Sequence, residues 1–189
     1  MKIKTLEISG FRSALEALRL PYSLEPRSHL GARYNIYPGI VKEDFESAIY
    51  TSSHVVLHKK DLHLMSTLVK RGDEHAKCIR GINVYAKITA PVYFWCEEEQ
   101  YNIGRYRLAS ESTMHTDCKG LSGEELQLTK ASISMGKELT KVDVFNYQAL
   151  RHIYFQRRNH RLSEWKIFTD WILTLPYAQE LITIENVNN

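Results

Sequence analysis

The chain has 189 residues and a mass of 22.0 kDa, which is enough for one well-buried core and too little for two ordinary domains. Hydrophobic residues make up 43% of it and charged residues 25%, which excludes a disordered chain and a membrane-embedded one. The net charge of +3 is too balanced to indicate general nucleic-acid binding, although local basic patches remain open. We therefore expect one domain over residues 1–189.

The cysteines and the first residues bear on the compartment of the protein. The start, MKIKTLEISGF, lacks the apolar run of a signal peptide, and no later segment approaches the length of a membrane span. Cys78, Cys96 and Cys118 are odd in number and far apart in sequence, so we expect free thiols and no disulfide framework or zinc knuckle. These features predict a cytoplasmic protein.

The first third of the chain predicts a strand, a short helix, a loop and a longer helix. Apolar and polar residues alternate loosely over Ile3–Ile8, and a short helical stripe follows over Ala14–Leu20. The segment Pro21–Gly39 is rich in Pro, Gly, Ser and Arg, which is typical of a loop. Asp61 opens a helix with an apolar face, and Gly72 provides its stop.

The middle of the chain contains the clearest strand. Apolar and polar residues alternate strictly over Ile82–Ile88, the period of a strand with one buried face. Thr89 can cap the next helix, in whose first turn Pro91 costs little because its missing N–H would have had no partner there. This predicted helix carries VYFWC and then three glutamates, Glu97–Glu99.

The last third predicts three helices. One lies around Gly123–Lys130, and a loop follows it as far as Lys141. Apolar residues at spacings of three and four predict a helix over Val142–Ile153 and a second one over Leu162–Ile172. The second helix ends at Leu175-Pro176, because the residue before proline is pushed out of helical geometry.

A group of basic and hydroxyl side chains follows the predicted strand and helix. Arginine supplies forked donors that match phosphate oxygens, and hydroxyl groups complete such a shell without adding charge. The group therefore predicts a site for a phosphorylated ligand. The alternative is a solvated loop whose arginines pair with Glu97–Glu99. The group consists of Arg105, Arg107, Ser110, Ser112, Thr113 and His115.

A second basic group lies further along the chain. Arg151, Tyr154 and Arg158 fall on one helical face at this spacing, with Arg157, His160 and Arg161 close by. This group could converge on the same ligand as the first. The alternative is a basic solvent face or a subunit-interface patch, the more common use of such residues.

Histidines and tryptophans complete the candidates. His54, His58 and His63 invite a metal site, but no glutamate stands in the HExxH position and no carboxylate completes a ligand set, so we predict no metal. The tryptophans lie on helical stripes, which indicates core positions, although a ring at a pocket edge could stack on a base or a flavin. They are Trp95, Trp165 and Trp171.

The order of these elements resembles a known family. The segment from MSTLVKRGDEHAKCIRGINVYAKITAPVYFW to SESTMH gives helix, glycine-containing turn, strand ending in Ala-Pro, helix and hydroxyl-rich turn. Later, NHRLSEWKIF is followed by PYAQELI. In both segments the chain resembles the flavin-dependent thymidylate synthases, over roughly its middle third and last fifth. It is also similar to proteins of phages and prophages.

The resemblance implies a fold and an activity. It implies a single compact α+β domain that forms a homotetramer, with FAD and dUMP bound where subunits meet. Members of the family transfer a one-carbon unit from methylenetetrahydrofolate with reduced flavin and use no enzyme nucleophile. The protein must then hold the nucleotide phosphate and stabilise negative charge developing on the uracil ring, for which arginines are suited.

The family motif Arg-His-Arg-x-x-Ser fits this sequence in two registers. One places it on Arg105, Tyr106, Arg107 and Ser110, and the other, counted from Ala90-Pro91, begins at Gln100 and loses both arginines. In either register the family residues that contact the nucleotide correspond to Glu111, Thr113 and His115.

The later family motif, Asn-x-Arg, falls on Asn159 and Arg161, and the asparagine belongs to the flavin site in the family. The family arginine that lies against the pyrimidine falls near Asp170, where a carboxylate would repel developing negative charge. A changed base, a changed reaction and a loss of activity all fit this departure.

The leading hypothesis is a divergent thymidylate synthase-like protein that binds a pyrimidine deoxynucleotide and FAD and modifies the base at a ring carbon. Arg105, Arg107, Ser110, Glu111, Thr113 and His115 would bind the nucleotide, and Asn159 and Arg161 the flavin. The alternatives are a non-catalytic oligomer that binds nucleic acid or protein through the second basic group, and a structural oligomer whose charged helices only form interfaces.

Overall fold

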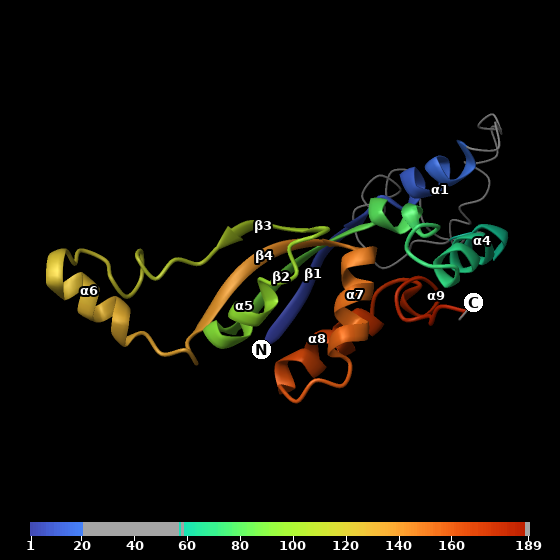
Figure 1. Cartoon of the computed structure of the whole chain (residues 1–189). Coiled ribbons are helices and arrows are strands. Elements are labelled where there is room, and N and C mark those ends of the chain that lie inside the picture. Colours follow the sequence, from blue (N-terminus) through green and yellow to red (C-terminus); the bar gives the residue numbers. More distant parts are fainter. Residues whose placement is uncertain (21–56, 58, 188–189) are drawn as a thin grey trace, which may run out of the picture.

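The computed structural model describes residues 1–20, 57 and 59–187 (Figure 1). Four antiparallel strands form one sheet in the order β1-β2-β4-β3. The strands are β1 (Lys2–Ser9), β2 (Asn83–Pro91), β3 (Arg105–Ser110) and β4 (Glu138–Asn146). The helices are α1 (Phe11–Arg19), α4 (Lys59–Lys70), the 3-10 helix η2 (Lys77–Gly81), α5 (Val92–Glu98), α6 (Gly123–Ser132), α7 (Tyr147–Arg157), α8 (Ser163–Leu173) and α9 (Ala178–Leu181).

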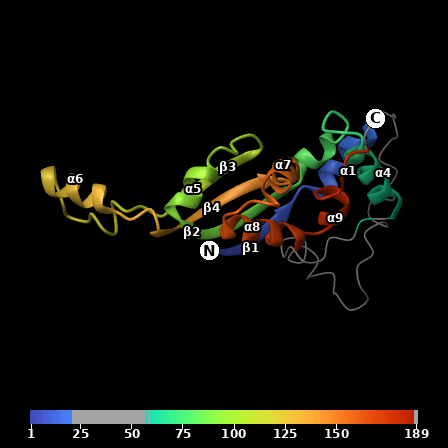
Figure 2. The ribbon, with the colours of Figure 1, turned by 60° about the horizontal axis from the view of Figure 1, so that its bottom comes forward.

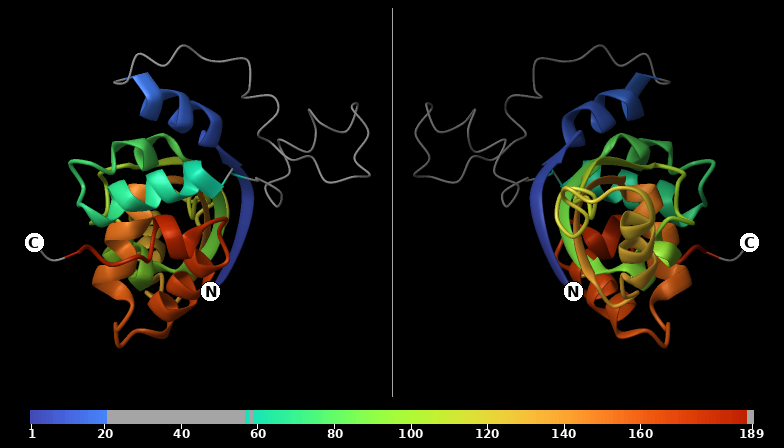
Figure 3. Two further views of the ribbon diagram at one scale, coloured as in Figure 1. Left: turned by 90° about the vertical axis from the view of Figure 1, so that its right-hand side faces the viewer. Right: turned by 90° about the vertical axis from the view of Figure 1, so that its left-hand side faces the viewer.

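The core lies between one face of this sheet and the helices. Val84 and Ile88 of β2 and Phe145 of β4 are fully buried on that face. Phe94 of α5 and Trp165 of α8 pack into the same core, with ring centroids 4.8 Å apart. Figure 3, which views the molecule from both ends, shows the helices gathered on one side of the sheet. The fold is therefore α+β with a single mixed core, as the sequence predicts.

The opposite face of the sheet carries tyrosines. Successive side chains of a strand point to opposite faces, so Tyr106 of β3 points away from the helices. Leu108 lies at an irregularity of the strand, between Arg107 and Ala109. Tyr85 of β2 lies beside Tyr106, Glu7 and Ser9 on this outer face. Tyr106 and Leu108 are both more than half exposed. Burial, Tyr106 and Glu7 raise the pKa of Tyr85, and a hydrogen bond with Ser9 opposes this shift.

The connection between β3 and β4, residues 111–137, forms an arm that extends away from the core (Figure 2). Its helix α6 has no buried residue. Polar contacts within the arm hold its two sides together: Lys137 pairs with Asp117, and Lys130 donates to the Thr113 hydroxyl. The arm therefore draws little of its stability from the main core.

Several predicted elements are confirmed. The predicted strands appear as β1 and β2, the helix opening at Asp61 as α4, the helix around Gly123–Lys130 as α6, and the helix over Leu162–Ile172 as α8. Gly72, predicted as the stop of α4, has a φ of 108°, a left-handed conformation that glycine adopts without strain. The loop predicted over Pro21–Gly39 lies outside the described residues.

The helix predicted over Val142–Ile153 is wrong in its first part, which continues β4 to Asn146. The spacing of Val142, Phe145 and Ala149 fits a helix, but residues up to Asn146 form a strand. In this strand Asp143 and Phe145 point to the core-facing side. The helix begins only at Tyr147, because the Asn146 side chain accepts a hydrogen bond from the Ala149 N–H at 2.8 Å. The loop predicted up to Lys141 is likewise replaced by β4 from Glu138.

Two further corrections concern the middle of the chain. Thr89 does not cap a helix, since it lies inside β2 and hydrogen-bonds Thr140 of the neighbouring strand, and Pro91 occupies the cap position of α5. The residues ahead of the predicted hydroxyl-rich turn SESTMH form a strand that the sequence does not predict, β3, whereas Thr113–His115 lie in a turn as predicted. None of the helices in the described part of the chain is long and apolar enough to cross a membrane.

Candidate functional site

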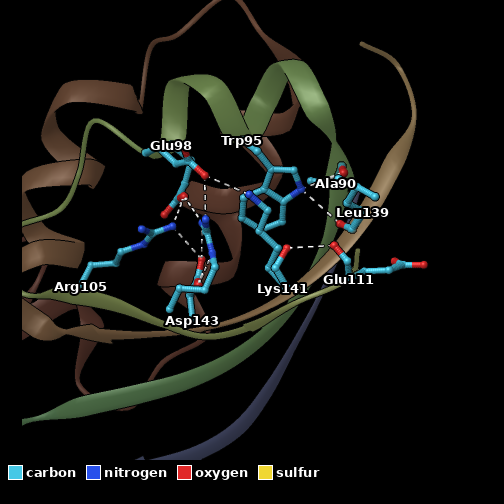
Figure 4. Close-up of polar contacts among 11 residues, drawn as sticks. Ala90, Trp95, Glu98, Arg105, Glu111, Leu139, Lys141 and Asp143 are labelled. Atoms are coloured by element: carbon cyan, nitrogen blue, oxygen red, sulfur yellow. Dashed lines mark hydrogen bonds and ion pairs between the residues drawn. The ribbon is translucent and has the colours of Figure 1, made fainter. Parts of the chain in front are cut away.

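The end of α5 and the core-facing side of β3 and β4 bring six charged side chains together (Figure 4). Arg105 and Arg107 lie two apart on β3 and so point to the same face. Asp143 is the β4 partner of Arg107 in the sheet register, and Lys141 lies two residues before it. Residues 98–99, at the end of α5, place two glutamates above these strands. We call these six residues the charged cluster.

Two buried carboxylates hold both arginines of the charged cluster. Asp143 Oδ2 accepts from Arg105 Nη2 at 3.0 Å, and Asp143 Oδ1 accepts from Arg107 Nε at 3.0 Å. Glu98 Oε2 accepts from Arg105 Nη2, and from Arg107 Nη2 at 3.2 Å. Both acidic side chains are fully buried. The two guanidinium groups are therefore fixed in place by groups that cannot reach water.

The exposed side of the charged cluster is different. Glu99 Oε1 accepts from Arg107 Nη1 at 2.7 Å and from Lys141 Nζ at 3.1 Å. The Lys141 ammonium also lies 4.4 Å from the ring centre of Trp95, an attractive cation–π geometry. The Trp95 ring is held by its Nε1–H, which donates to the carbonyls of Ala90 and Leu139 at 3.0 and 3.1 Å.

Burial changes the acidity of this cluster. Burial raises the pKa of Glu98 to about 7; the nearby arginines oppose this shift and the Asp143 charge reinforces it. Glu98 Oε1 and Arg105 Nε are buried without a hydrogen-bond partner among the described residues. Hydrogen bonds from Arg107 and Lys141 lower the pKa of Glu99 instead. The buried carboxyl can thus hold a proton near neutral pH, whereas the exposed one stays ionised.

The raised pKa of Glu98 predicts a pH-dependent stability. The pKa is about 7 in the folded state against an ordinary 4.5, so the folded state holds the proton more tightly than the unfolded chain. Stability from this group is fully present below pH 4.5 and is lost as the pH rises through 7. Between pH 4.5 and a pH above 7, the free energy of unfolding of the wild type should fall by on the order of 3 kcal/mol relative to that of Glu98→Gln.

Urea denaturation at a series of pH values measures this difference, because the titration of all other groups is common to both proteins. The Glu98→Gln variant cannot ionise at this position and should show the flatter profile. Parallel profiles of the two proteins would contradict the assignment of a raised pKa to Glu98.

The other predicted nucleotide-binding residues lie outside the charged cluster, at the end of β3 and in the arm. The Ser110 hydroxyl donates to the Glu111 carbonyl at 3.1 Å, and both residues are exposed. Glu111 Oε2 accepts from the Thr140 N–H at 2.9 Å. Thr113 contacts Lys130 within the arm, and His115 is exposed. Arg105 and Arg107 are thus brought together in the structure, and the other four lie along the path from β3 into the arm.

The second basic group is largely committed to other partners. Arg151 is buried, and its Nη1 donates to the Ile182 carbonyl at 2.7 Å, so it fastens the C-terminal segment. The predicted solvent face is therefore wrong for Arg151, because backbone carbonyls satisfy its guanidinium in the interior. Arg157 pairs with Glu97 at 3.4 Å and lies 4.7 Å from the Trp165 ring centre. Arg158 pairs with Glu185.

Asn159 and Arg161 lie between α7 and α8, and both are exposed. Neither side chain makes a hydrogen bond or ion pair within residues 1–20, 57 and 59–187. The two predicted ligand sets do not contact each other within the described residues. On α5, Glu98 pairs with the arginines of β3, and Glu97 pairs with Arg157, which belongs to neither set.

The tryptophans and histidines can now be placed. Trp95, Trp165 and Trp171 are all buried, which confirms the predicted core positions. No group of three or more metal-binding side chains occurs within the described residues, and His54 and His58 lie outside them.

Sequence reasoning missed Lys141 and Asp143 as site residues, and it named Glu98 and Glu99 only as possible ion-pair partners of the arginines. The sequence pattern predicts a loop up to Lys141 and a helix from Val142, and neither places Lys141 and Asp143 beside the arginines. The signal that could have found them is a strand pattern, KVDVF, with charged residues at positions that face the core. A charge in such a position needs a partner, which the arginines of β3 supply.

Comparison with known proteins identifies the fold. No protein-family model and no curated protein sequence matches the chain. Among solved structures, the flavin-dependent thymidylate synthase ThyX from Helicobacter pylori, complexed with FAD and dUMP, aligns over 97% of this chain and 98% of its own. Its TM-score is 0.68 at 12% identity, and a second structure of the H. pylori enzyme gives 0.65 at 11%.

A third solved structure is the UMP/dUMP methylase PolB from Streptomyces cacaoi, bound with 5-Br dUMP. It has a TM-score of 0.60 at 11% identity and covers 98% of this chain and 95% of its own. The similarity therefore extends over nearly the whole chain in all three comparisons, while the sequences have diverged widely. The protein has the fold of the flavin-dependent thymidylate synthases, as a divergent example of it.

Proposed function

We propose that the protein is a divergent enzyme that modifies a pyrimidine deoxynucleotide such as dUMP at a ring carbon, an FAD-dependent nucleotide methyltransferase-type activity. The proteins of similar fold were solved with dUMP, FAD or 5-Br dUMP. The observation that carries the proposal is the position of Arg107: Asp143 fixes its Nε and Nη2, while its Nη1 lies towards the exposed side of the charged cluster. A guanidinium held in this way suits a phosphate.

The proposed nucleotide-binding residues run from the charged cluster into the arm. Arg105 and Arg107 would hold the phosphate, with the Ser110 hydroxyl beside it. Glu111 and Thr113 would hydrogen-bond the nucleotide, and His115 would contact it from the arm. The support is their order along β3 and the arm, and the exposure of Ser110, Glu111 and His115, which leaves their side chains accessible to a ligand.

FAD is the proposed cofactor. The residues between α7 and α8 suit it, because the amide of Asn159 and the guanidinium of Arg161 are exposed and have no partner within the described residues. An amide can hydrogen-bond the flavin ring and a guanidinium can bind a pyrophosphate. When bound, FAD would supply the reducing equivalents. The chain would bind both ligands and orient the pyrimidine.

We further propose a homotetramer, because no hydrogen bond or ion pair joins the two ligand sets within the described part of one chain. Tyr106 on the outer face of the sheet and Leu108 further along β3 are exposed and supply apolar surface for a second copy. Residues 1–189 would form one domain, acting in the cytoplasm, where the three free thiols stay reduced.

Binding of dUMP tests the proposal through Arg107→Met. A hydrogen bond to a charged group contributes about 1.5 to 3 kcal/mol, so the dissociation constant for dUMP should rise about ten- to hundredfold. Isothermal titration calorimetry measures it, with dCMP as the second nucleotide. Arg161→Met is the matched control: it should bind dUMP like the wild type and lose FAD absorbance on purification.

Wild-type protein that is colourless after expression with ample flavin, and that shows no thermal shift with dUMP or dCMP, would overturn the proposal. The alternative of nucleic-acid or protein binding through the second basic group has less support. Arg151 is buried and Arg157 and Arg158 are ion-paired, although Arg161 is exposed and makes no ion pair within the described residues. Binding of a single-stranded oligonucleotide that weakens steeply with salt, without affinity for mononucleotides, would favour that alternative.

A further inference from the structure

One oxygen atom of the charged cluster occupies a place suited to a ligand. Glu99 Oε1 accepts from Arg107 Nη1 at 2.7 Å and from Lys141 Nζ at 3.1 Å. The remaining hydrogen bonds of Arg107 go to the buried carboxylates of Glu98 and Asp143. The Arg107–Lys141 pair therefore forms a two-cation cradle, and its anion is the exposed carboxylate.

The three carboxylates of the cluster differ in how easily they can leave. Glu98 and Asp143 are fully buried, and moving either would remove an ion-pair partner from both arginines. The Glu99 side chain is 52% exposed, follows the last residue of α5, and can turn into water. A carboxylate in water regains its hydration, so its release costs far less than the release of a buried one.

Lys141 cannot follow Glu99 into water. Its side chain is only 8% exposed and its ammonium lies over the Trp95 ring. Without Glu99, Lys141 would lose its ion-pair partner and keep only the electrostatic attraction of Glu98, which favours an incoming anion in the place that Glu99 leaves. When Glu98 is ionised, three cations face three carboxylates with Glu99 counted, and the cluster carries one excess positive charge without it. When Glu98 holds a proton, the excess is larger by one. In both states the excess positive charge suits a phosphate monoester.

We propose that Glu99 is a built-in competitor that closes the Arg107–Lys141 cradle in the free protein, and that the phosphate monoester of the nucleotide displaces it. Lys141 is then a third phosphate-binding cation, in addition to the two arginines of β3. This inference rests on the proposed function, since it assigns the phosphate of that ligand to a defined pair of donors.

Two substitutions separate the roles of the cradle residues. Glu99→Ala removes the competitor, so dUMP no longer has to break the contact of Glu99 with Arg107 and Lys141. The dissociation constant for dUMP should therefore fall about tenfold, which corresponds to one modest charged contact. Lys141→Met removes a donor and should raise the constant by about tenfold or more. Glu124→Ala, an exposed acid of α6, makes the same change in net charge and should leave the constant within about twofold.

Ligands without the monoester provide the second readout. Deoxyuridine, which lacks the phosphate, should bind Glu99→Ala and wild type equally, and inorganic pyrophosphate should bind Glu99→Ala more tightly. The variant should unfold at a lower temperature than wild type without ligand, because Lys141 then lacks its anion, and saturating pyrophosphate should remove the difference.

The outcomes separate this inference from the proposed function. If dUMP binds wild type in a manner dependent on Arg107 but Glu99→Ala leaves its affinity unchanged, the competitor role is wrong and the proposed function stands. If dUMP does not bind, but Glu99→Ala gains pyrophosphate affinity that Lys141→Met removes, the cradle stands and the proposed function falls. Equal pyrophosphate affinity in wild type and both variants would overturn the cradle.

Discussion

Replacing Asp143 with alanine is expected to lower the free energy of unfolding by about 3 to 5 kcal/mol. Asp143 is fully buried and accepts hydrogen bonds from both Arg105 and Arg107. Its loss leaves two guanidinium groups in the interior with Glu98 as their remaining buried carboxylate. Breaking a buried ion pair by removing one partner leaves charge uncompensated, and this is the source of the large effect.

Chemical denaturation at neutral pH measures this change, and dUMP titration measures its effect on the ligand. Asp143→Asn keeps the shape and one acceptor oxygen and should lose less stability than Asp143→Ala. Asp170→Ala, an exposed acid of α8, is the surface control and should change stability by less than about 0.5 kcal/mol. If Asp143→Ala were as stable as this control, the buried network would have no structural role.

Replacing Trp165 with alanine is the second change with a large expected effect, about 3 to 5 kcal/mol of unfolding free energy. The ring is fully buried and lies 4.8 Å from the Phe94 ring and 5.7 Å from the Phe168 ring, measured between centroids. Its Nε1–H donates to Glu97 Oε2 at 2.8 Å. The substitution therefore opens a cavity in the main core and removes a partner of the helix that carries Glu98.

Ile167→Ala, on the same helix, is the matched control for Trp165→Ala. Ile167 is exposed, so its truncation should lower the free energy of unfolding by less than about 0.5 kcal/mol. It changes the intrinsic helix propensity of α8 about as much as Trp165→Ala does. Urea denaturation compares the two variants with the wild type. Equal losses in both variants would mean that α8 contributes through its helix alone and not through the packing of Trp165.

The regular elements of the chain could be predicted where one periodicity dominates. The segment Ile82–Ile88 alternates without interruption, and α4 has an apolar face and a glycine stop, so both follow from local sequence. The strand β4 was assigned in part to a helix because Val142, Phe145 and Ala149 also fit a helical spacing. Its alternation is interrupted at Lys141 and Asp143, the positions that build the charged cluster.

The candidate site could be predicted only in part. Arg105 and Arg107 were identified from their chemistry, and the sequence left open whether they bind an anion or pair with Glu97–Glu99. In the structure they pair with Glu98, Glu99 and Asp143. The contribution of Asp143 could not be foreseen, because it depends on the register between β3 and β4, and the second of these strands was not recognised.

The register of β3 against β4 has a consequence for folding. Arg107 lies opposite Asp143 only after the edge strand has paired across the long arm, so the charged cluster does not exist in a chain whose sheet is incomplete. If the cluster binds the proposed nucleotide, only the native state can do so. Binding and folding would then be coupled, and a higher concentration of the nucleotide would raise the fraction of molecules that are native.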